Sequence, residues 1–198
     1  PKPSSAASDV YKRQKSYFLE EAMTIIDPEV EFVSGHPMAG REKKGYGYAS
    51  KEVFKNANYI LIEHPVNQKE CISFMERFVG TLGFKSVKIM SPQAHDEIIS
   101  FTSQLPHAIA VSLINSDNEK YETGKYIGDS YRDLTRIANI NENLWSELFL
   151  RNSDYLLASI EAFEEQLDLI KVALKDNDER LLKDLFIKSS LRREKLEK

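Results

Sequence analysis

The sequence predicts an α/β segment followed by an all-helical segment, with the boundary near Ser91. Two observations support this prediction. Before Ser91, short apolar runs typical of strands alternate with helix-forming runs, as in a β-α-β-α-β arrangement. After Ser91, most stretches carry apolar residues at helical spacing. A chain of 198 residues is long enough for one large core or two small domains.

Three short apolar runs in the first segment are predicted to form strands: residues 31–35 (EFVSG), 58–63 (NYILIE) and 86–90 (SVKIM). The first run is expected to end before His36, where a restricted turn begins at His36-Pro37. A polar, Gly-rich loop is predicted for residues 40–50, and a helical turn for residues 51–56.

Two longer helices are predicted in the same segment. Tyr17 to Ile26 contains strong helix formers with apolar residues at helical spacing, and Asp27-Pro28 stops it. Gln68 to Leu82 places its apolar side chains along one helix face, and Gly83 ends it.

In the second segment, Ser91 and Pro92 are a predicted cap and first turn of a long helix. Pro106 lies inside that helix and predicts a kink, because proline removes a backbone donor. After a looser stretch around residues 122–130, Asn141 is a predicted cap for one long amphipathic helix over residues 142–174. A charged helix over residues 178–196 follows.

Composition excludes several classes of protein. A net charge of −4 and an isoelectric point near 5.7 give no support for nucleic-acid or anionic-membrane binding. No apolar run approaches the roughly 20 residues of a membrane span. Cys71 is the single cysteine, which suits a reducing compartment. The sequence therefore predicts a soluble, cytoplasmic protein.

Residues 1–14, PKPSSAASDVYKRQ, have the composition of a non-native leader rather than of a signal peptide. They contain no initiating Met and no apolar stretch. We expect the native protein to be longer at this end, and we predict three regions: the leader 1–14, an α/β region 15–90 and a helical region 91–198.

His36 is the first candidate for chemistry. It lies between Gly35 and Pro37, where the predicted strand ends, and strand ends of α/β sheets face ligand crevices. The ordinary pKa of a histidine side chain suits a general base near neutral pH. The alternative is a turn histidine bonded to the backbone, and spacing alone leaves both interpretations open.

Two further histidines lie on the long predicted helix. His95 and Asp96 are in its first turn. The simpler explanation is that the helix dipole favours an acid such as Asp96 there and that His95 makes a local hydrogen bond. His107 follows Pro106, and a kinked helix that also carries the Ser103 hydroxyl could form a pocket wall. A histidine at the edge of the core is an equally good explanation of His107.

The segment YRDLTRIA contains Arg132, Asp133 and Arg136. The two arginines are four residues apart, so they would share a helix face. Asp133 could hold one of them while the other binds a carboxylate in the bidentate geometry that guanidinium favours. A surface charge cluster is the alternative, but Leu134 and Ile137 suggest a half-buried segment and favour a function.

A metal site finds little support in the sequence. No pair of the four histidines has metal-ligand spacing, and Cys71 is far from all of them. A glycine-rich phosphate loop of the GxGxxG or GxxxxGK[ST] type is also missing, and GYG at 45–47 does not lead from a strand into a helix.

Three motifs in order, GHPMAG, HDEIISFTSQLPHAIA and RDLTRIA, with Trp145 and Asn152 after them, resemble prephenate dehydrogenase of the TyrA type. The resemblance covers nearly all of residues 15–198. It implies the C-terminal part of a Rossmann-like dinucleotide-binding domain followed by an all-α dimerisation domain. It also implies NAD-dependent oxidative decarboxylation of prephenate to 4-hydroxyphenylpyruvate, in tyrosine biosynthesis, by a homodimer.

The same resemblance implies roles for particular residues. His36 would be catalytic and accept the proton of the substrate's ring hydroxyl, because loss of hydride from that carbon makes a carbonyl. Gly35 and Pro37 would contact the cofactor. The residues expected at the substrate are Arg136 (on a carboxylate), Asp133 (orienting that region), His107, Ser103, Gln104 and Trp145.

The chain also departs from the family pattern. The GxGxxG fingerprint is missing, and Arg13 and Gln14 stand where many members have a serine-containing turn. Many relatives carry a second histidine at the position of Gln104, which can bond a substrate but cannot carry a proton. We therefore expect these 198 residues to be inactive on their own and the full-length form to be the enzyme.

Three other functions remain open from the sequence. Arogenate dehydrogenase differs only in the substrate side chain, and NADP could replace NAD. A helical dimerisation module without chemistry would use the apolar faces of residues 142–174 and 178–196. A metal hydrolase is the third alternative.

Overall fold

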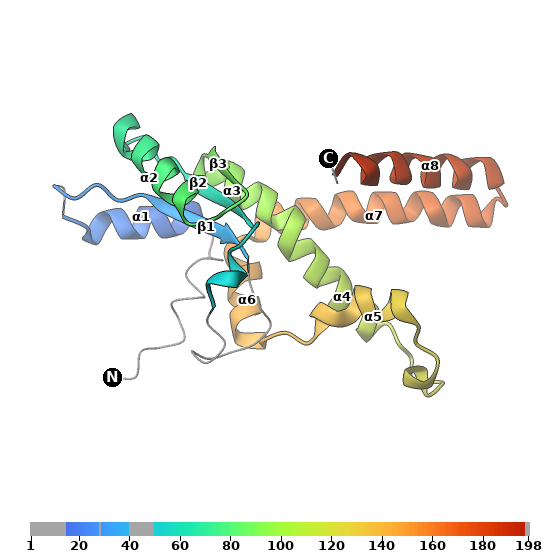
Figure 1. Cartoon of the computed structure of the whole chain (residues 1–198). Helices are drawn as coiled ribbons and strands as arrows, with labels where there is room; N and C mark the ends of the chain where they lie inside the picture. Colours follow the sequence, from blue (N-terminus) through green and yellow to red (C-terminus); the bar gives the residue numbers. More distant parts are fainter. Residues whose placement is uncertain (1–14, 28, 40–49, 197–198) are drawn as a thin grey trace. The chain divides into compact units, whose positions relative to one another are not determined.

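The computed structural model describes residues 15–27, 29–39 and 50–196 of the chain. The predicted leader 1–14 and most of the predicted Gly-rich loop, including GYG at 45–47, lie outside the described residues. The chain divides after Leu156 into two compact units, which are described separately. The first contains a three-stranded sheet with several helices, and the second is a pair of helices (Figure 1).

The sheet has the order β1-β2-β3, with β1 (Ser34–Met38), β2 (Asn58–Ile62) and β3 (Ser86–Met90). β1 is antiparallel to β2, and His36 pairs with Ile60. β2 is parallel to β3. The predictions for β2 and β3 are confirmed. The first strand was predicted three residues too early, and β1 includes both His36 and Pro37.

Helices cover both faces of this sheet. α1 (Lys15–Ile25) brings Leu19 against Ile60 and Ile62, which form the core on one face. α2 (Lys69–Thr81) connects β2 to the parallel strand β3 and contacts both. Gly83 has φ +88°, the left-handed conformation that glycine adopts at helix ends, as its place in the sequence predicts. Leu61, between Ile60 and Ile62, is also fully buried, as expected of a strand covered on both faces.

The long helix predicted after Ser91 is interrupted by a π-helical stretch. α3 (Pro92–Ile99) begins with the Ser91 hydroxyl accepting a hydrogen bond from the Ala94 amide, which confirms the cap. The π-helical turn η5 (Ser100–Gln104) then leads into α4 (Leu105–Asn115). Pro106 lies in the first turn of α4. Because proline has no N–H, it cannot form the α-helical hydrogen bond to a carbonyl of the preceding turn, and the irregular stretch lies in that turn.

Short elements connect the longer ones: η4 (Lys51–Val53), η6 (Thr123–Lys125), α5 (Asp129–Thr135) and η7 (Arg136–Ala138). Both α5 and η7 contact α4. The segment RDLTRIA is therefore held against the helix that carries His107.

The single helix predicted over residues 142–174 is wrong, because the chain forms α6 (Glu142–Arg151) and α7 (Ser153–Lys175). Asn141 caps α6 as predicted, accepting from the Leu144 amide at 3.1 Å. The break is at Asn152, whose φ and ψ of −120° and 29° leave the helical region. The Asn152 side chain is buried and donates hydrogen bonds to α3 and η5. These bonds hold Asn152 in a conformation that interrupts the helix.

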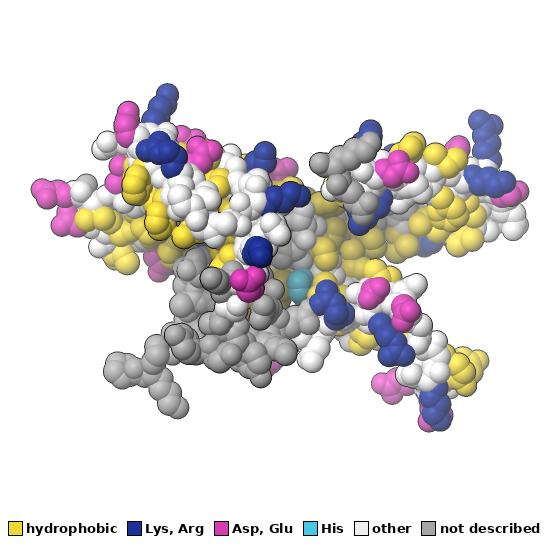
Figure 2. Space-filling view, in the orientation of Figure 1, with side chains coloured by type: hydrophobic (Ala, Val, Ile, Leu, Met, Phe, Trp, Pro, Cys, Tyr) yellow, Lys and Arg dark blue, Asp and Glu magenta, His cyan; other side chains and the backbone are white. Residues whose placement is uncertain are grey.

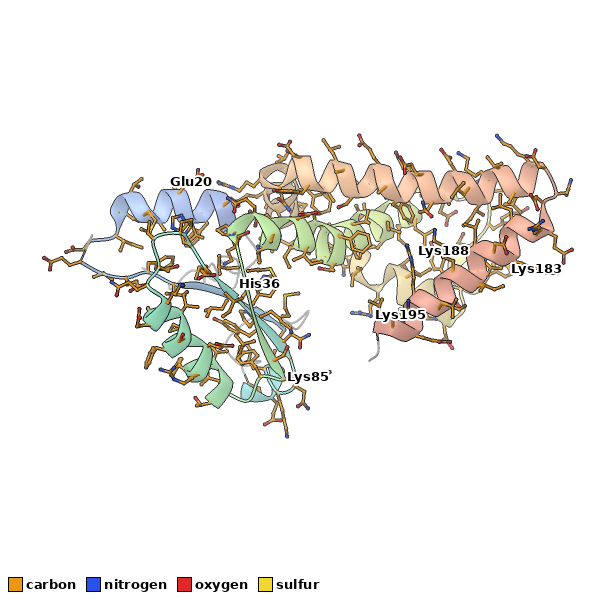
Figure 3. The ribbon with its side chains drawn as sticks, turned by 90° about the horizontal axis from the view of Figure 1, so that it is seen from above. Glu20, His36, Lys85, Lys183, Lys188 and Lys195 are labelled. Carbon is orange, nitrogen blue, oxygen red and sulfur yellow. The ribbon has the colours of Figure 1, made fainter. Side chains whose placement is uncertain are left out.

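The second unit contains the rest of α7 from Leu157 and α8 (Glu179–Leu196). Asn177, with φ +51°, turns the chain between them, and Asp178 caps α8 through the Leu181 amide. Several large apolar side chains on these helices are exposed: Leu167, Val172, Leu174, Phe186, Ile187 and Leu191. Figure 2 shows apolar side chains on this pair, and Figure 3 labels three lysines of α8. We refer to residues 157–196 as the α7–α8 hairpin.

None of the helices in the described part of the chain is long and apolar enough to cross a membrane.

Candidate active site

His36 lies within β1 and is buried, with 7% of its surface exposed. The prediction that it stands at a strand end is therefore wrong. Pairing with β2 continues through Pro37 to Met38, and a proline is tolerated because β1 is the outer strand of the three described ones. His36 and Ile60 are register partners, so the histidine lies on the face of the sheet that α1 covers.

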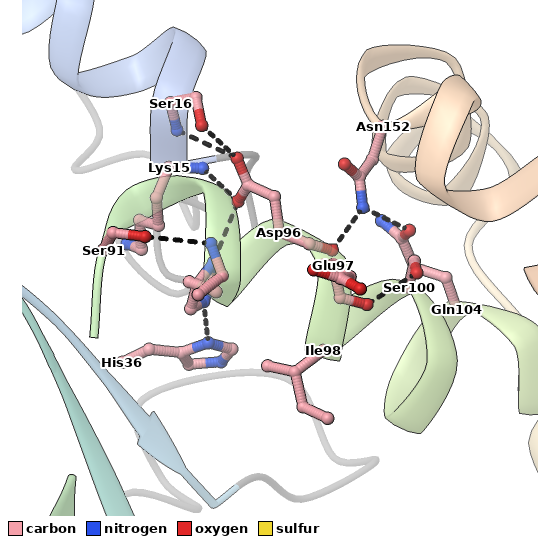
Figure 4. Close-up of polar contacts among 12 residues, drawn as sticks. Lys15, Ser16, His36, Ser91, Asp96, Glu97, Ile98, Ser100, Gln104 and Asn152 are labelled. Carbon is pink, nitrogen blue, oxygen red and sulfur yellow. Dashed lines mark hydrogen bonds and ion pairs between the residues drawn. The ribbon is translucent and has the colours of Figure 1, made fainter. Parts of the chain in front are cut away.

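A chain of hydrogen bonds joins His36 to α3. The Nδ1 atom of His36 lies 2.9 Å from Nε2 of His95, and the Nδ1 atom of His95 lies 2.9 Å from Oδ1 of Asp96. His95 and Asp96 are each 1% exposed. Figure 4 shows the dashed contacts running from His36 toward Asp96, and Figure 3 shows His36 on the part of the sheet that faces α3.

The Asp96 carboxylate also holds the start of α1. It accepts hydrogen bonds from the Lys15 amide at 2.6 Å, the Ser16 amide at 3.0 Å and the Ser16 hydroxyl at 2.7 Å. These amides belong to the first turn of a helix, where backbone donors have no partner within the helix. Asp96 therefore serves as a cap supplied from a distant part of the sequence. We call Lys15, Ser16, His36, His95 and Asp96 the His36–Asp96 cluster.

Burial changes the proton affinities in this cluster. Burial lowers the pKa of Lys15 to about 8, although the Asp96 carboxylate opposes the shift. Burial also lowers the pKa of His95, which Asp96 opposes and the Lys15 ammonium reinforces. The Lys15 ammonium lies 3.4 Å from the Gly35 carbonyl, next to His36. The cluster thus places a neutral His95 between His36 and a carboxylate.

The sequence did not identify most of this cluster. The sequence favours local helix-start roles for His95 and Asp96, and no motif in it points to Lys15 or Ser16. The local bond between His95 and Asp96 is present, but both residues also bond to partners on other elements. Asp96 and Lys15 are 81 residues apart, so no spacing rule could relate them. The only available signal was a His-Asp pair directly behind a helix cap.

Gln104, predicted to contact substrate, is 3% exposed, and both ends of its amide have partners. Its nitrogen donates to the Leu148 carbonyl at 3.1 Å, and its oxygen accepts from the Asn152 amide at 2.8 Å. The Asn152 nitrogen also donates to the Asp96 carbonyl at 3.0 Å. Gln104 therefore connects α6 and the start of α7 to the helix that carries the His36–Asp96 cluster.

His107 and Trp145, two more predicted substrate residues, lie together. Their rings stack with centroids 3.7 Å apart and an interplanar angle of 28°. The Nδ1 atom of His107 lies 2.8 Å from the Ser103 carbonyl, so the backbone of Ser103 also belongs to this group. Trp145 is buried and His107 is half-buried. The structure thus brings together Ser103, His107 and Trp145, three residues predicted to contact substrate.

The predicted arginine segment is more exposed than its sequence suggested. Arg132, Asp133 and Leu134 are all exposed. Arg132 donates to the Ile127 carbonyl at 3.2 Å rather than pairing with Asp133. Arg136 is exposed too and begins the turn η7, because α5 ends at Thr135. The expectation of a half-buried segment is wrong for these residues, although η7 does pack against α4.

Gly35 and Pro37, predicted to contact a cofactor, lie on β1 on either side of His36. A Cβ atom added at Gly35 would lie 2.1 Å from the Tyr59 hydroxyl oxygen and 2.6 Å from two carbons of its ring. Tyr59 of the neighbouring strand occupies the space that a side chain at position 35 would need, so any larger residue here requires Tyr59 to move.

Within residues 15–27, 29–39 and 50–196, no group of three His, Cys, Asp or Glu side chains is placed to hold a metal ion. A hollow of about 400 Å³ lies beside the carboxyl ends of the parallel strands β2 and β3, where dinucleotides bind in α/β sheets. Its lining includes the carboxylates of Glu20 and Glu63. These do not suit a pyrophosphate, and we assign no nucleotide position there.

Two family models match the chain in succession. Residues 12–88 match the family described as prephenate dehydrogenase, nucleotide-binding domain. Residues 91–188 match the family described as prephenate dehydrogenase, dimerization domain. Together they cover most of the sequence.

Individual proteins agree with this match. Prephenate dehydrogenase of Bacillus subtilis (strain 168) is 29% identical over 168 residues, which are 83% of this chain and 45% of that protein. The enzyme of Lactococcus lactis subsp. cremoris (strain MG1363) is 30% identical over 178 residues, 87% and 48% of the two chains. The chain thus spans about half the length of these curated relatives.

A solved structure is also similar. It is prephenate dehydrogenase from A. aeolicus in complex with hydroxyphenyl propionate and NAD+, and it is 32% identical to this chain with a TM-score of 0.72. The similarity covers 82% of this chain and 58% of that one.

Proposed function

Because the chain belongs to the prephenate dehydrogenase family, we propose that it forms part of an enzyme that oxidatively decarboxylates prephenate to 4-hydroxyphenylpyruvate in tyrosine biosynthesis. NAD is the proposed cofactor, and the chemistry it supplies when bound is acceptance of a hydride. The observation that carries the proposal is the buried His36, bonded through His95 to the carboxylate of Asp96.

The reaction requires a proton acceptor at the ring hydroxyl. When hydride leaves the carbon that bears this hydroxyl, the oxygen becomes a carbonyl and must lose its proton. A histidine is the side chain suited to accept that proton near neutral pH. His36 is the histidine that the fold fixes between the sheet and α3, so we assign it this role.

Prephenate carries two carboxylates, and we propose that Arg136 binds one of them through the paired N–H groups of its guanidinium. Its position in η7 against α4 supports this assignment, because α4 carries His107. His107, Ser103 and Trp145 are proposed to form the adjacent wall, with Asp133 orienting the arginine segment. Gln104 is proposed to support that wall from behind, since its amide is bonded to Leu148 and Asn152.

We further propose a cytoplasmic homodimer formed through the helical region 91–198. The second matched family is described as a dimerization domain, and the exposed apolar side chains of the α7–α8 hairpin suit an interface. Cytoplasmic localisation is supported by the biosynthetic role proposed here and by the single thiol of Cys71.

The test is the rate of NADH formation by the full-length enzyme with prephenate. Replacing His36 with Asn should lower kcat on the order of 10²- to 10⁴-fold, the range typical for loss of a general base. Thermal unfolding should stay close to wild type. The control His64→Asn, which changes a histidine in the loop after β2, should keep the wild-type rate. A His36→Asn enzyme with wild-type turnover would refute the assignment.

The same assay separates the close alternatives. Arogenate should give a lower kcat/KM than prephenate, and NADP a lower kcat/KM than NAD. If arogenate is the better substrate, the enzyme is an arogenate dehydrogenase, and the role of His36 is unchanged because both substrates carry the same ring hydroxyl.

A further inference from the structure

The His36–Asp96 cluster determines which nitrogen of His36 carries the proton. Four groups surround the Asp96 carboxylate: the Lys15 and Ser16 amides, the Ser16 hydroxyl and Nδ1 of His95. The two backbone amides can only donate, so Asp96 is an acceptor toward them. Oδ1 accepts from the Lys15 amide and also faces His95, which therefore donates through Nδ1–H.

A neutral histidine that donates through Nδ1 has its lone pair on Nε2. Burial lowers the pKa of His95 and favours this neutral form. The Nε2 atom of His95 lies 2.9 Å from Nδ1 of His36. Since His95 can only accept at that atom, Nδ1 of His36 must carry the proton that forms the bond. The Nε2 atom of His36 then holds a lone pair.

We propose that His95 is a positioning residue that, oriented by Asp96, holds His36 in the tautomer with its proton on Nδ1, so that Nε2 is the atom that takes the substrate's proton. This inference rests on the proposed function for its chemistry, whereas the tautomer itself follows from the hydrogen bonds. A carboxylate that fixes a histidine tautomer is a known arrangement, and here the effect passes through a second imidazole.

In the reaction, the O–H bond of the ring hydroxyl breaks, and its proton forms a bond to Nε2 of His36. The electron pair left on oxygen forms the carbonyl as hydride leaves the ring carbon. Release of CO2 then returns the electron pair of the broken C–C bond to the ring, which leaves a phenolate oxygen. That oxygen takes the proton back from Nε2, so His36 ends as it began. While protonated, His36 keeps its Nδ1–H bond to His95.

Two substitutions at one position test the role of His95. His95→Gln offers an amide oxygen as acceptor to His36, whereas His95→Leu offers none. We expect His95→Leu to lower kcat on the order of 10²-fold with little change in KM, and His95→Gln to stay within about tenfold of wild type. Thermal unfolding of both variants reports whether they fold. A residue needed only for packing would not separate Gln from Leu in this way.

The tautomer can be read directly, without activity. In ¹⁵N spectra of histidine-labelled protein above neutral pH, Nδ1 of His36 should be the protonated nitrogen in wild type and in His95→Gln. His95→Leu should give a mixture of tautomers. The control His64→Gln should leave the His36 signals and kcat unchanged.

Each outcome bears on one proposal. A His36 protonated on Nε2 in wild type, or equal kcat for the Leu and Gln variants, overturns the positioning role. If the wild-type enzyme does not oxidise prephenate, the proposed function fails, and the ¹⁵N result still decides the tautomer.

Discussion

The His36–Asp96 cluster and the α7–α8 hairpin place opposite kinds of side chain in unusual surroundings. In the cluster, polar and charged groups are buried and are bonded to partners within the same unit. In the hairpin, large apolar side chains such as Phe186 and Leu191 are exposed, at 58% and 54%. A buried polar group is stable only when paired, and an exposed apolar surface is explained by a partner. The cluster is complete within the chain, whereas the hairpin suits association.

The largest effect is expected from removing the carboxylate of the cluster. Asp96→Ala leaves the start of α1 without its acceptor and the Lys15 ammonium buried without a counter-charge. Leaving these buried donors without an acceptor costs about 1–3 kcal/mol of unfolding free energy for each group, measurable by urea denaturation. The control Asp168→Ala removes an exposed partner of Lys171 on α7 and should change stability little. Equal losses in the two variants would contradict the contrast.

Lys15 should make the stability depend on pH. Its pKa is about 8 in the folded chain against 10.5 for the ordinary side chain, so the unfolded chain binds this proton more tightly. Stability contributed by this group is therefore lowest below pH 8 and rises between about pH 8 and 10.5. The difference of 10.5 − 8 pKa units corresponds to about 3 kcal/mol.

Lys15→Met removes this titration, so the rise in unfolding free energy between about pH 8 and 10.5 should disappear. The exposed Lys183→Met, on α8, should keep the rise. Urea denaturation at a series of pH values measures both. A wild-type curve that is flat in this window, or the same slope in Lys15→Met, would show that the ammonium is solvated rather than buried.

Alanine substitutions at two glycines of the first unit should have smaller effects on stability, and the two effects should be opposite in sign. Gly35→Ala forces Tyr59 to move, because the new Cβ would lie 2.1 Å from its hydroxyl oxygen, and should lower stability by about 1–3 kcal/mol. Gly80→Ala, inside α2, meets no atom within 4 Å and should raise stability by about 0.5–1 kcal/mol. Thermal unfolding measures both. If the two changes had the same sign, close packing would not be the reason for Gly35.

Local patterns predicted the elements better than they predicted the site. The strands β2 and β3 and the helix α2 lie within a residue of their predicted bounds, because alternation, helical spacing and a closing glycine are local signals. β1 was misplaced because His36-Pro37 looks like a turn until pairing with β2 is known. The break at Asn152 depends on its bonds to Asp96 and Gln104, which are 56 and 48 residues away. The cluster around His36 joins three separate elements, so residue types suggested the histidine but not its partners.

The smallest effect on folding should come from the hairpin, where the effect on assembly should be the largest. Phe186→Ser with Leu191→Ser removes two exposed apolar side chains of α8 and leaves its polar residues in place. We expect the protein to change from dimer to monomer in light scattering after size exclusion. Trp145, the single tryptophan of these 198 residues, belongs to the first unit and reports its unfolding. At protein concentrations low enough for the wild type to be monomeric as well, the unfolding midpoints of variant and wild type should agree within experimental error. The control Lys183→Ser with Lys188→Ser should remain dimeric.

A dimer that survives the loss of Phe186 and Leu191 would place the interface on another surface. A fall in the Trp145 midpoint would mean that these side chains support the fold rather than association.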